Sequence, residues 1–362
     1  MQRIAIVINS LKKGGAEKQA VLLGRVLCGS YDVRIVVMRP EEGISEELLR
    51  LYGGNKSDII PLGGNHGKGM AGLWSVLREW KPQVMFCYLT YSNVIGAMVG
   101  RMCRVRYIYQ GLRNAYIPGY KIPAELIANI LSTGAVLNNH AGVDYFAKRG
   151  VKHIKVIENC FPSVRDAYVR QSHGHVTVVT VARFHPQKDY LTSIRAFRIA
   201  HERVPTMRYR IIGHGEDEAL VRSWINAEGL DDCVEIFVNP ADVSRLVDEC
   251  DIYMSTSLWE GTSNSIMEAM DASLPVVATD VGDNCRLVGN GVTGYLCQIR
   301  DVEAVASSLV ALAESPTLRN DMGCRGNALL RECYSETLFR EKYVALINDA
   351  LSASQAREAQ VR

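Results

Sequence analysis

Two glutamates frame a short polar stretch, SLWEGTSNSIMEAM, at residues 257–270. Glu260 and Glu268 are separated by small polar residues, one glycine and two apolar residues. Ser265 and Glu268 fit the S-x-x-E capping box, in which each side chain satisfies a backbone N–H group at a helix start. The same stretch suits a ligand site, because N–H groups at a helix start bind anions or sugars and carboxylates hold hydroxyls. The stretch alone leaves both interpretations open.

Arg183 and Lys188 have the chemistry to bind a diphosphate. Arg183 directly follows the apolar run VTVVTVA at 176–182, and Lys188 comes five residues later. An arginine offers a planar fork and a lysine offers a point charge, and both suit phosphate oxygens. An exposed basic loop is the structural alternative.

Glycines accompany two other apolar runs. Gly14 and Gly15 come after RIAIVI at 3–8, and Gly213 ends MRYRIIG at 207–213. A glycine lets the backbone approach a ligand closely, and the helix start at Gly15 offers N–H donors and the positive end of a dipole. A plain strand-to-helix turn explains Gly14 and Gly15 equally well. The spacing is not G-x-G-x-x-G, so the fingerprint of a dinucleotide site is absent.

Polar segments follow two apolar runs in the first half of the chain. TYSN follows the predicted strand VMFCYL, and QGLRNAY follows RYIY. We expect both segments to be strand-end loops whose side chains contact a polar or anionic ligand, namely Asn93, Gln110, Arg113 and Asn114.

Short β-branched runs alternate with helical stretches along the whole chain. The expected strands are 3–8, 33–38, 84–89, 106–109, 135–138, 153–159, 176–182, 207–213, 234–238, 251–256, 275–279 and 293–297. Continuous apolar strands separated by helices predict parallel sheets that are covered on both faces. Two such series predict an α/β protein with two Rossmann-like domains, residues 1–163 and 164–335, and a final helix from Glu336. Ligands of such sheets bind beyond the carboxyl ends of the strands, so both domains are expected to surround a nucleotide diphosphate sugar in an interdomain cleft.

The composition is that of a globular protein. The chain has 362 residues, of which 48% are hydrophobic and 22% charged, and this length suits two domains. The ten cysteines show neither a C-x-x-C pair nor zinc-site spacing, which indicates reduced, buried thiols. No apolar run approaches about 18 residues and the N-terminal run is too short for a signal peptide. We therefore expect a cytoplasmic protein.

Charge is unevenly distributed along the chain. Residues 1–163 hold 21 Lys/Arg and 11 Asp/Glu, whereas residues 164–362 hold 20 and 28. The basic first half suggests an anionic partner such as a membrane surface or a phosphate-bearing substrate, with a chance imbalance as the alternative. No nucleic acid is expected, because the basic residues are not clustered with aromatic stacking positions.

Together these motifs resemble the retaining GT-B glycosyltransferases of family 4, also called the glycosyl transferase group 1 family. The similarity covers nearly the whole chain and is strongest over residues 176–315. Its motifs are GGAEK at 14–18, VARFHPQKD at 181–189, IIGHGE at 211–216, SLWEGTSNSIMEAM at 257–270 and DVGDNCRLVGNGVTGYL at 280–296. The E-x7-E spacing combined with R-x4-K is specific, whereas either pattern alone is not.

The resemblance implies a role for each candidate residue. Arg183 and Lys188 would hold the diphosphate and stabilise the leaving phosphate, with Glu260 near the donor sugar, so these three are the expected catalytic residues. Glu268 would accept hydrogen bonds from the ribose hydroxyls. The other donor contacts would come from Gly14, Gly15, Gly213, Gly261, Thr262 and Ser263, and the acceptor contacts from Asn93, Gln110, Arg113 and Asn114. The final helix, 336–362, would pack back onto the first domain.

The chain departs from the family pattern in two loops. Many members carry a histidine in the first-domain loop, where this chain has YQGLRN, so Arg113 or Asn114 takes that place or it is empty. The later loop usually has two glycines and a glutamate, whereas Asp283 and Arg286 stand at the matching positions here. No metal or other cofactor is expected, because the arginine and lysine replace it.

The predicted function is retaining transfer of a hexosyl or N-acetylhexosaminyl group from a nucleotide-diphosphate sugar. The acceptor would be a saccharide or lipid-linked saccharide, in the assembly of cell-surface polysaccharides or glycans. A basic first domain would bring the protein to the inner face of an anionic membrane, through Lys12, Lys13, Arg101 and Arg104. The alternatives are a sugar-nucleotide epimerase of the same fold, a catalytically inactive sugar-nucleotide-binding protein, and a nicotinamide oxidoreductase.

Overall fold

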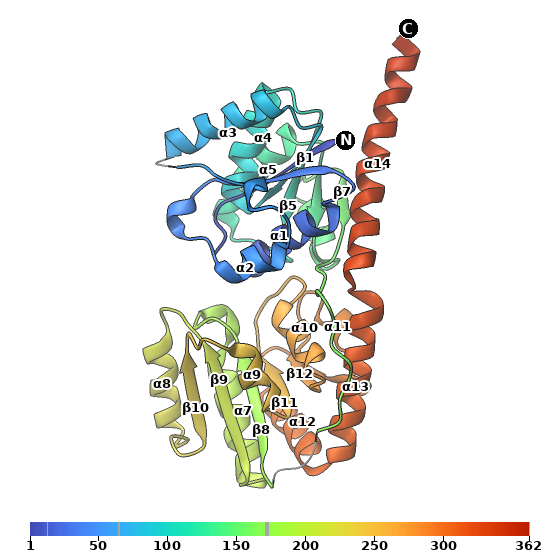
Figure 1. The fold of residues 1–362 in the computed structure, drawn as a ribbon. Helices are drawn as coiled ribbons and strands as arrows, with labels where there is room; N and C mark the ends of the chain where they lie inside the picture. The colour runs from blue at the N-terminus through green and yellow to red at the C-terminus, as the bar shows by residue number, and fades with distance from the viewer. Residues whose placement is uncertain (13, 64–65, 171–173, 362) are drawn as a thin grey trace. The chain divides into compact units, whose positions relative to one another are not determined.

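The chain forms two compact units. The computed structural model describes residues 1–12, 14–63, 66–170 and 174–361, without the side chains of 66, 67 and 353–361. Unit 1 comprises residues 1–162 and 334–362, and unit 2 comprises residues 163–333 (Figure 1). The boundaries expected from the sequence lie within two residues of these divisions.

Unit 1 is built on a seven-stranded parallel sheet with the order β3-β2-β1-β4-β5-β6-β7. Its strands are β1 Arg3–Ile8, β2 Asp32–Val37, β3 Ile59–Pro61, β4 Val84–Tyr88, β5 Tyr107–Leu112, β6 Gly134–Leu137 and β7 Ile154–Val156. Strand β3 was not expected from the sequence, and β5 continues three residues beyond the expected RYIY run.

Helices cover both faces of this sheet (Figure 1). They are α1 Gly15–Leu27, α2 Glu46–Tyr52, α3 His66–Trp80, α4 Thr90–Met102, α5 Ile122–Leu131, α6 Gly142–Ala147 and α14 Glu336–Val361. In β1, Ile4, Ile6 and Ile8 face a core that includes residues of α1, α2 and α14, whereas Ala5 and Val7 face a core with α3 and α4. All five side chains are fully buried, which explains why the strand is apolar without interruption.

Helix α14 completes unit 1 from the far end of the sequence. Phe339, Tyr343 and Ile347 lie in the same core as the isoleucines of β1, and α14 packs against α1. The last helix therefore belongs to the unit that the first residues begin.

Unit 2 is built on a six-stranded parallel sheet with the order β10-β9-β8-β11-β12-β13. Its strands are β8 Val176–Val181, β9 Met207–Gly213, β10 Val234–Val238, β11 Ile252–Ser255, β12 Val276–Thr279 and β13 Gly294–Cys297. Its helices are α7 Tyr190–Arg203, α8 Glu218–Ala227, α9 Val243–Asp248, α10 Asn264–Asp271, α11 Asn284–Leu287, α12 Val302–Glu314 and α13 Pro316–Cys333. The expected α/β architecture with two parallel sheets is confirmed.

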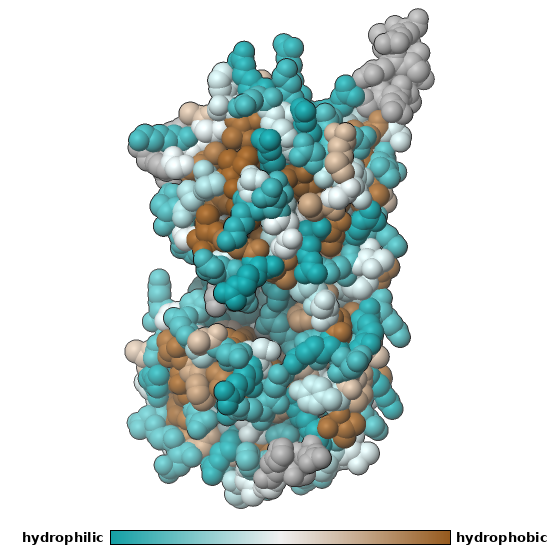
Figure 2. Space-filling model, in the orientation of Figure 1, coloured by the Kyte–Doolittle hydropathy of each residue, from teal (hydrophilic) through white to brown (hydrophobic). Residues whose placement is uncertain are grey.

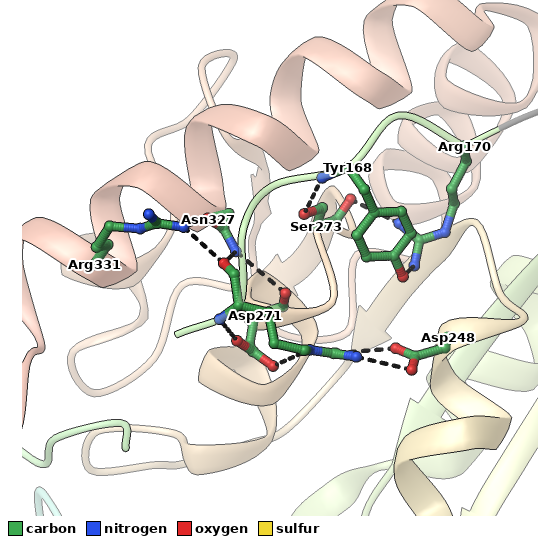
Figure 3. Close-up of polar contacts among 8 residues, drawn as sticks. Tyr168, Arg170, Asp248, Asp271, Ser273, Asn327 and Arg331 are labelled. Atoms are coloured by element: carbon green, nitrogen blue, oxygen red, sulfur yellow. Dashed lines mark hydrogen bonds and ion pairs between the residues drawn. The ribbon is translucent and has the colours of Figure 1, made fainter. Parts of the chain in front are cut away.

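A polar cluster fastens the segment by which the chain enters unit 2 (Figure 3). The backbone N–H and Nε of Arg165 donate to Asp271, each at 2.7 Å, and its terminal nitrogens donate to both carboxylate oxygens of Asp248 at 2.8 and 3.0 Å. The carbonyl oxygen of Arg165 accepts hydrogen bonds from Asn327 and Arg331 at 3.1 and 2.7 Å. The hydrogen bond to Asp248 is the main cause that raises the pKa of Arg165. Because Asn327 and Arg331 belong to α13, the entry to unit 2 is tied to its last helix.

No helix in the described part of the chain combines the length and apolarity needed to cross a bilayer.

Candidate active site

The sheet of unit 2 reverses its strand order between β8 and β11. Strands β9 and β10 extend the sheet on one side, and β12 and β13 extend it on the other. Open α/β sheets bind ligands beyond the carboxyl ends of the strands at such a reversal. Arg183 and Lys188 follow β8, and Glu260 follows β11, so the structure brings these three candidates to one edge of unit 2.

Lys188 and Glu260 form an ion pair at this edge. The Nζ atom of Lys188 donates a hydrogen bond to Oε1 of Glu260. The two side chains are only 15% and 11% exposed. The sequence suggested separate roles for the two residues and did not predict that they pair. An anion that binds Lys188 must therefore share the ammonium group with Glu260 or displace the carboxylate.

Arg183 is an exposed cation at the same edge of the sheet. Its side chain is exposed, and no ion pair or hydrogen bond joins it to another described residue. A guanidinium in this state can form two parallel hydrogen bonds with a phosphate without first losing a protein partner. No group of three or more metal-binding side chains occurs among the described residues.

Hydrogen bonds to backbone carbonyls hold the loop after β8 against the loop after β11. Nε2 of Gln187 donates to the carbonyl of Trp259 at 2.6 Å, and the N–H of Leu258 donates to the carbonyl of Gln187 at 2.8 Å. The hydroxyl of Thr256 donates to the carbonyl of Lys188 at 3.1 Å. Gln187 and Thr256 thus position the ion pair, and no local pattern in the sequence distinguished them.

The start of α10 differs from the expected capping box. The N-cap is Ser263, whose Oγ accepts a hydrogen bond from the N–H of Ile266 at 3.5 Å. The expectation that Ser265 and Glu268 form the box is wrong, because the helix begins two residues earlier than that box requires. Glu260 lies in the loop before α10, whereas Glu268 lies within the helix and is partly buried.

The loop after β12 supports the backbone around Glu260. Gly282 has a φ of 59°, and a Cβ atom there would lie 2.5 Å from the carbonyl oxygen of Glu260. The N–H of Asp283 donates to the carbonyl of Gly261 at 3.2 Å. Only a glycine fits this close approach, so the DVGDN motif contacts the EGTS motif directly. The predicted donor residues of that motif, Gly261, Thr262 and Ser263, are buried.

Gly213 has a structural reason to be glycine. A Cβ atom at this position would lie 1.9 Å from the carbonyl oxygen of Ala182. The absence of a side chain therefore lets the end of β9 pack against the end of β8. Contact of Gly213 with a donor stays a prediction.

Unit 1 carries the remaining candidates, and its sheet reverses between β1 and β4. Gly14 is the N-cap of α1 and Gly15 its first residue, and Gly14 supplies no side-chain cap to the N–H groups of the first turn. Asn9 links the two strand ends, because its Oδ1 accepts from the N–H and hydroxyl of Ser92 at 3.1 and 2.7 Å. The glycines therefore lie at the edge where unit 1 would bind a ligand.

Asn93 and Gln110 do not lie in loops. Asn93 is in the first turn of α4 and Gln110 is inside β5, and both are fully buried. The amide of Asn93 exchanges hydrogen bonds with the backbone of Gly111, both at 3.1 Å, and donates to Glu125 at 3.0 Å. The expected loop positions are wrong, because the helix starts earlier and the strand ends later than the sequence indicated. Acceptor contacts of these two residues stay predictions.

Arg113 and Asn114 follow β5 directly. The guanidinium of Arg113 lies over the ring of Tyr88, 4.0 Å from its centroid, and its nitrogen atoms are shielded from solvent. Among the described residues no carboxylate pairs with it. Asn114 is exposed. Of the four predicted acceptor residues, Asn114 is therefore the accessible one, and the preceding Arg113 contributes a buried positive charge.

Unit 1 also holds a charged group around Glu158 that the sequence did not single out. Glu158 follows β7, its Oε1 lies 2.8 Å from Nε2 of His140, and its Oε2 accepts a hydrogen bond from Lys342 of α14 at 2.6 Å. Burial acts to raise the pKa of Glu158, but the hydrogen bonds from Lys342 and His140 outweigh it and lower the pKa to about 2. Glu158 thus stays a carboxylate that ties α14 to the loop after β6.

The sequence of unit 2 matches a known family. Residues 169–328 match the family model described as "Glycosyl transferases group 1". The amylovoran biosynthesis glycosyltransferase AmsK of Erwinia amylovora is 32% identical over 150 residues, which are 39% of this chain and 37% of AmsK. The putative colanic acid biosynthesis glycosyltransferase WcaL of Escherichia coli is 31% identical over 148 residues, which are 39% of this chain and 36% of WcaL. The matched region spans less than two fifths of these relatives.

Solved structures match the fold of nearly the whole chain. Anabaena Alr3699/HepE in complex with UDP-glucose has a TM-score of 0.80 at 18% identity, over 96% of this chain and 100% of that chain. Sucrose-phosphate synthase from Thermosynechococcus elongatus has a TM-score of 0.81 at 15% identity, over 98% of this chain and 100% of that chain. Two parallel-sheet units and these neighbours show the GT-B fold, and residues 169–328 are similar in sequence to the group 1 glycosyl transferases.

Proposed function

We propose that this protein transfers a sugar from a nucleoside-diphosphate donor to a saccharide or lipid-linked saccharide acceptor. The observation that carries the proposal is the cationic edge of unit 2. Arg183, which has no partner among the described residues and is exposed, and a sheltered Lys188 both follow β8, at the strand reversal where such sheets bind ligands. Two cations with different geometry suit a diphosphate better than a single anionic group.

The proposed reaction retains the anomeric configuration. The bond between the sugar and the diphosphate breaks, and the acceptor oxygen bonds to the same face of the sugar carbon. The proton of the acceptor hydroxyl passes to the departing phosphate. Arg183 and Lys188 would stabilise the negative charge that develops on that phosphate. Glu260 would orient the sugar rather than attack it, because its carboxylate is held by Lys188.

UDP is the nucleotide to test first. The structural neighbour with the matching fold was solved with UDP-glucose, and a relative that is 26% identical over 141 residues is named as a galactosyltransferase that acts on a GlcNAc-diphosphoundecaprenol. We propose a hexosyl or N-acetylhexosaminyl donor and a role in the assembly of a cell-surface polysaccharide. Because the two cations supply the positive charge, we propose that no metal is required. We also propose that the basic first unit brings the enzyme to an anionic membrane surface.

The test is incubation with a panel of nucleotide sugars, with and without glycolipid or oligosaccharide acceptors. Release of free nucleotide that depends on the acceptor is expected, and NMR of the product should show the donor's anomeric configuration. EDTA should leave the rate unchanged. An epimerase would instead convert the donor sugar without any acceptor. Failure to bind any nucleoside diphosphate would refute the proposal.

A further inference from the structure

Helix α5 reverses the usual distribution of residues on a surface helix. Its only charged residue, Glu125, is 2% exposed, whereas Ile127 and Ile130 are 51% and 80% exposed. Pro123 is exposed on the same side, at i, i+4 and i+7 spacing. A helix that simply covers a sheet places its apolar side inward and its charges outward. The outer side of α5 is apolar and therefore suited to a non-aqueous surface.

Exposed apolar side chains continue on the neighbouring elements. Tyr120, just before α5, is 79% exposed, and Met102, at the end of α4, is 66% exposed. The ends of α4 and α5 lie together, because Nε of Arg101 donates to the carbonyl of Leu131 at 2.6 Å. On the face drawn in Figure 2, hydrophobic residues of unit 1 are exposed beside hydrophilic ones. We call Met102, Tyr120, Ile127 and Ile130 the α5 surface.

Basic residues flank the α5 surface on two sides. Residues 101–156 hold nine Lys/Arg and two Asp/Glu, and one of the two acidic residues is the buried Glu125. The first flank is joined to α5 by the Arg101 hydrogen bond and consists of exposed Arg101, Arg104 and Arg106. The second flank consists of exposed Lys148, Arg149, Lys152 and Lys155.

The second flank is also fixed beside α5. The amide of Asn129 donates to the carbonyl of Lys152 at 3.2 Å and accepts from its N–H at 2.8 Å. The segment before β7 therefore runs next to α5. An apolar strip with cationic margins on both sides is the pattern of helices that lie in the interface of an anionic bilayer.

We propose that the α5 surface docks unit 1 onto an anionic lipid bilayer. Ile127, Ile130 and Met102 enter the boundary between headgroups and acyl chains, while the flanking arginines and lysines bind lipid phosphates. A second copy of this chain would bring the same cationic flanks against each other, and like charges disfavour such a dimer. An anionic bilayer supplies both the opposite charge, on its headgroups, and an apolar interior.

The α5 surface begins near the predicted acceptor residues. Tyr120 and α5 follow the segment of Arg113 and Asn114 at the carboxyl end of β5. A lipid-linked acceptor would then reach that edge while its lipid stays in the bilayer. This step rests on the proposed function. Of the four basic residues expected to bind membranes, Arg101 and Arg104 belong to the first flank of this surface. Lys12 instead lies 3.5 Å from Glu42, and Lys13 lies outside the described residues.

The test is co-sedimentation of the full chain with vesicles of phosphatidylcholine alone and of phosphatidylcholine with phosphatidylglycerol. Binding to the anionic vesicles is expected, together with a loss of at least about tenfold in Ile127→Ser/Ile130→Ser. Arg101→Gln/Arg104→Gln should weaken binding by about fivefold per charge, and added salt should remove this difference. The matched controls are Val292→Ser/Ile299→Ser, which change apolar side chains of unit 2 that are 48% and 46% exposed. These controls should bind as the unchanged protein does.

Nucleotide release with a water-soluble acceptor, measured for the same variants, should stay at the level of the unchanged protein. That activity tests the proposed function separately from docking. Equal binding to neutral and anionic vesicles, or full binding by Ile127→Ser/Ile130→Ser with its fold intact by circular dichroism, would overturn the inference. A dimer in analytical ultracentrifugation that this double variant abolishes would show that a second copy covers the surface instead.

Discussion

Removal of the Lys188 charge tests whether the ion pair belongs to the diphosphate site. Lys188→Met keeps most of the side-chain length and removes only the ammonium group. In the unchanged protein this group is 15% exposed and paired with Glu260, which is 11% exposed. The substitution therefore has two separable effects, one on folding and one on binding.

The effect on folding comes from Glu260. Its carboxylate loses its cation in a site that excludes most water, and an unsatisfied buried polar group costs about 1–3 kcal/mol. The effect on binding comes from the phosphate, since a hydrogen bond to a charged group contributes about 1.5–3 kcal/mol. Because Lys188 must share its charge with Glu260, the lower half of that range applies. We expect the dissociation constant for a nucleoside diphosphate to rise by about 10- to 40-fold.

Calorimetric titration with UDP and with uridine measures the binding effect. Uridine lacks the diphosphate, so its affinity should not change. Thermal unfolding measures the folding effect. The control is the double variant Lys188→Met/Glu260→Gln, which removes both charges: it should recover stability but not UDP affinity. Unchanged UDP affinity in Lys188→Met, or recovery of that affinity in the double variant, would show that Lys188 only neutralises Glu260.

Three further predictions concern other charged groups. Arg165→Met leaves two partly buried aspartates without a cation, so the free energy of unfolding of unit 2 should fall by about 2–4 kcal/mol. Thermal unfolding measures this loss, and a destabilisation below about 0.5 kcal/mol would contradict the role of Arg165 in holding the entry segment. Glu158→Gln should lower the stability of unit 1 at pH 7 by about 1–2 kcal/mol after allowance for solvent screening. The pKa of about 2 lies below the unfolded value of about 4.3, so this contribution is present above pH 4.3 and is lost as the pH falls toward 2; urea unfolding across this range should show the two proteins converging. Glu268→Ala should lower kcat/KM for the nucleotide sugar by at least about tenfold, and full activity would remove Glu268 from the proposed site.

The sequence predicted the strands best where burial on both faces makes them apolar. RIAIVI is β1, because Ile4, Ile6 and Ile8 meet one core and Ala5 and Val7 the other. Strand β3 has three residues and ends in proline, so it gives no run long enough to notice. Strand β5 contains Gln110 and Gly111, which are typical of loops. The ladder with β4 and β6 keeps them in the sheet.

The local sequence pattern also predicted the wrong N-cap for α10. The sequence offers Ser263, Asn264 and Ser265 as possible caps, and only the backbone geometry decides among them. The S-x-x-E pattern selected Ser265, whereas the contact of Glu260 and Gly261 with the loop of Gly282 fixes an earlier entry into the helix.

The contacts that assemble the candidate site are distant in sequence. Lys188 and Glu260 are 72 positions apart, and each was assigned a role from its own motif. Their pairing depends on the adjacency of β8 and β11 and on contacts such as that of Gln187 with Trp259. Single motifs carry no information about such contacts, so residue types were predictable and their partners were not.

The discontinuity of unit 1 has a consequence for synthesis on the ribosome. Unit 2 is one uninterrupted segment, 163–333, and every element of its sheet is available once that segment has emerged. Unit 1 begins first, yet the core that contains the β1 isoleucines stays open until Phe339, Tyr343 and Ile347 arrive in α14. Since domains fold as units during synthesis, the second unit is expected to become protease-resistant before the first. The earliest residues of this chain are thus among the last to reach their native packing.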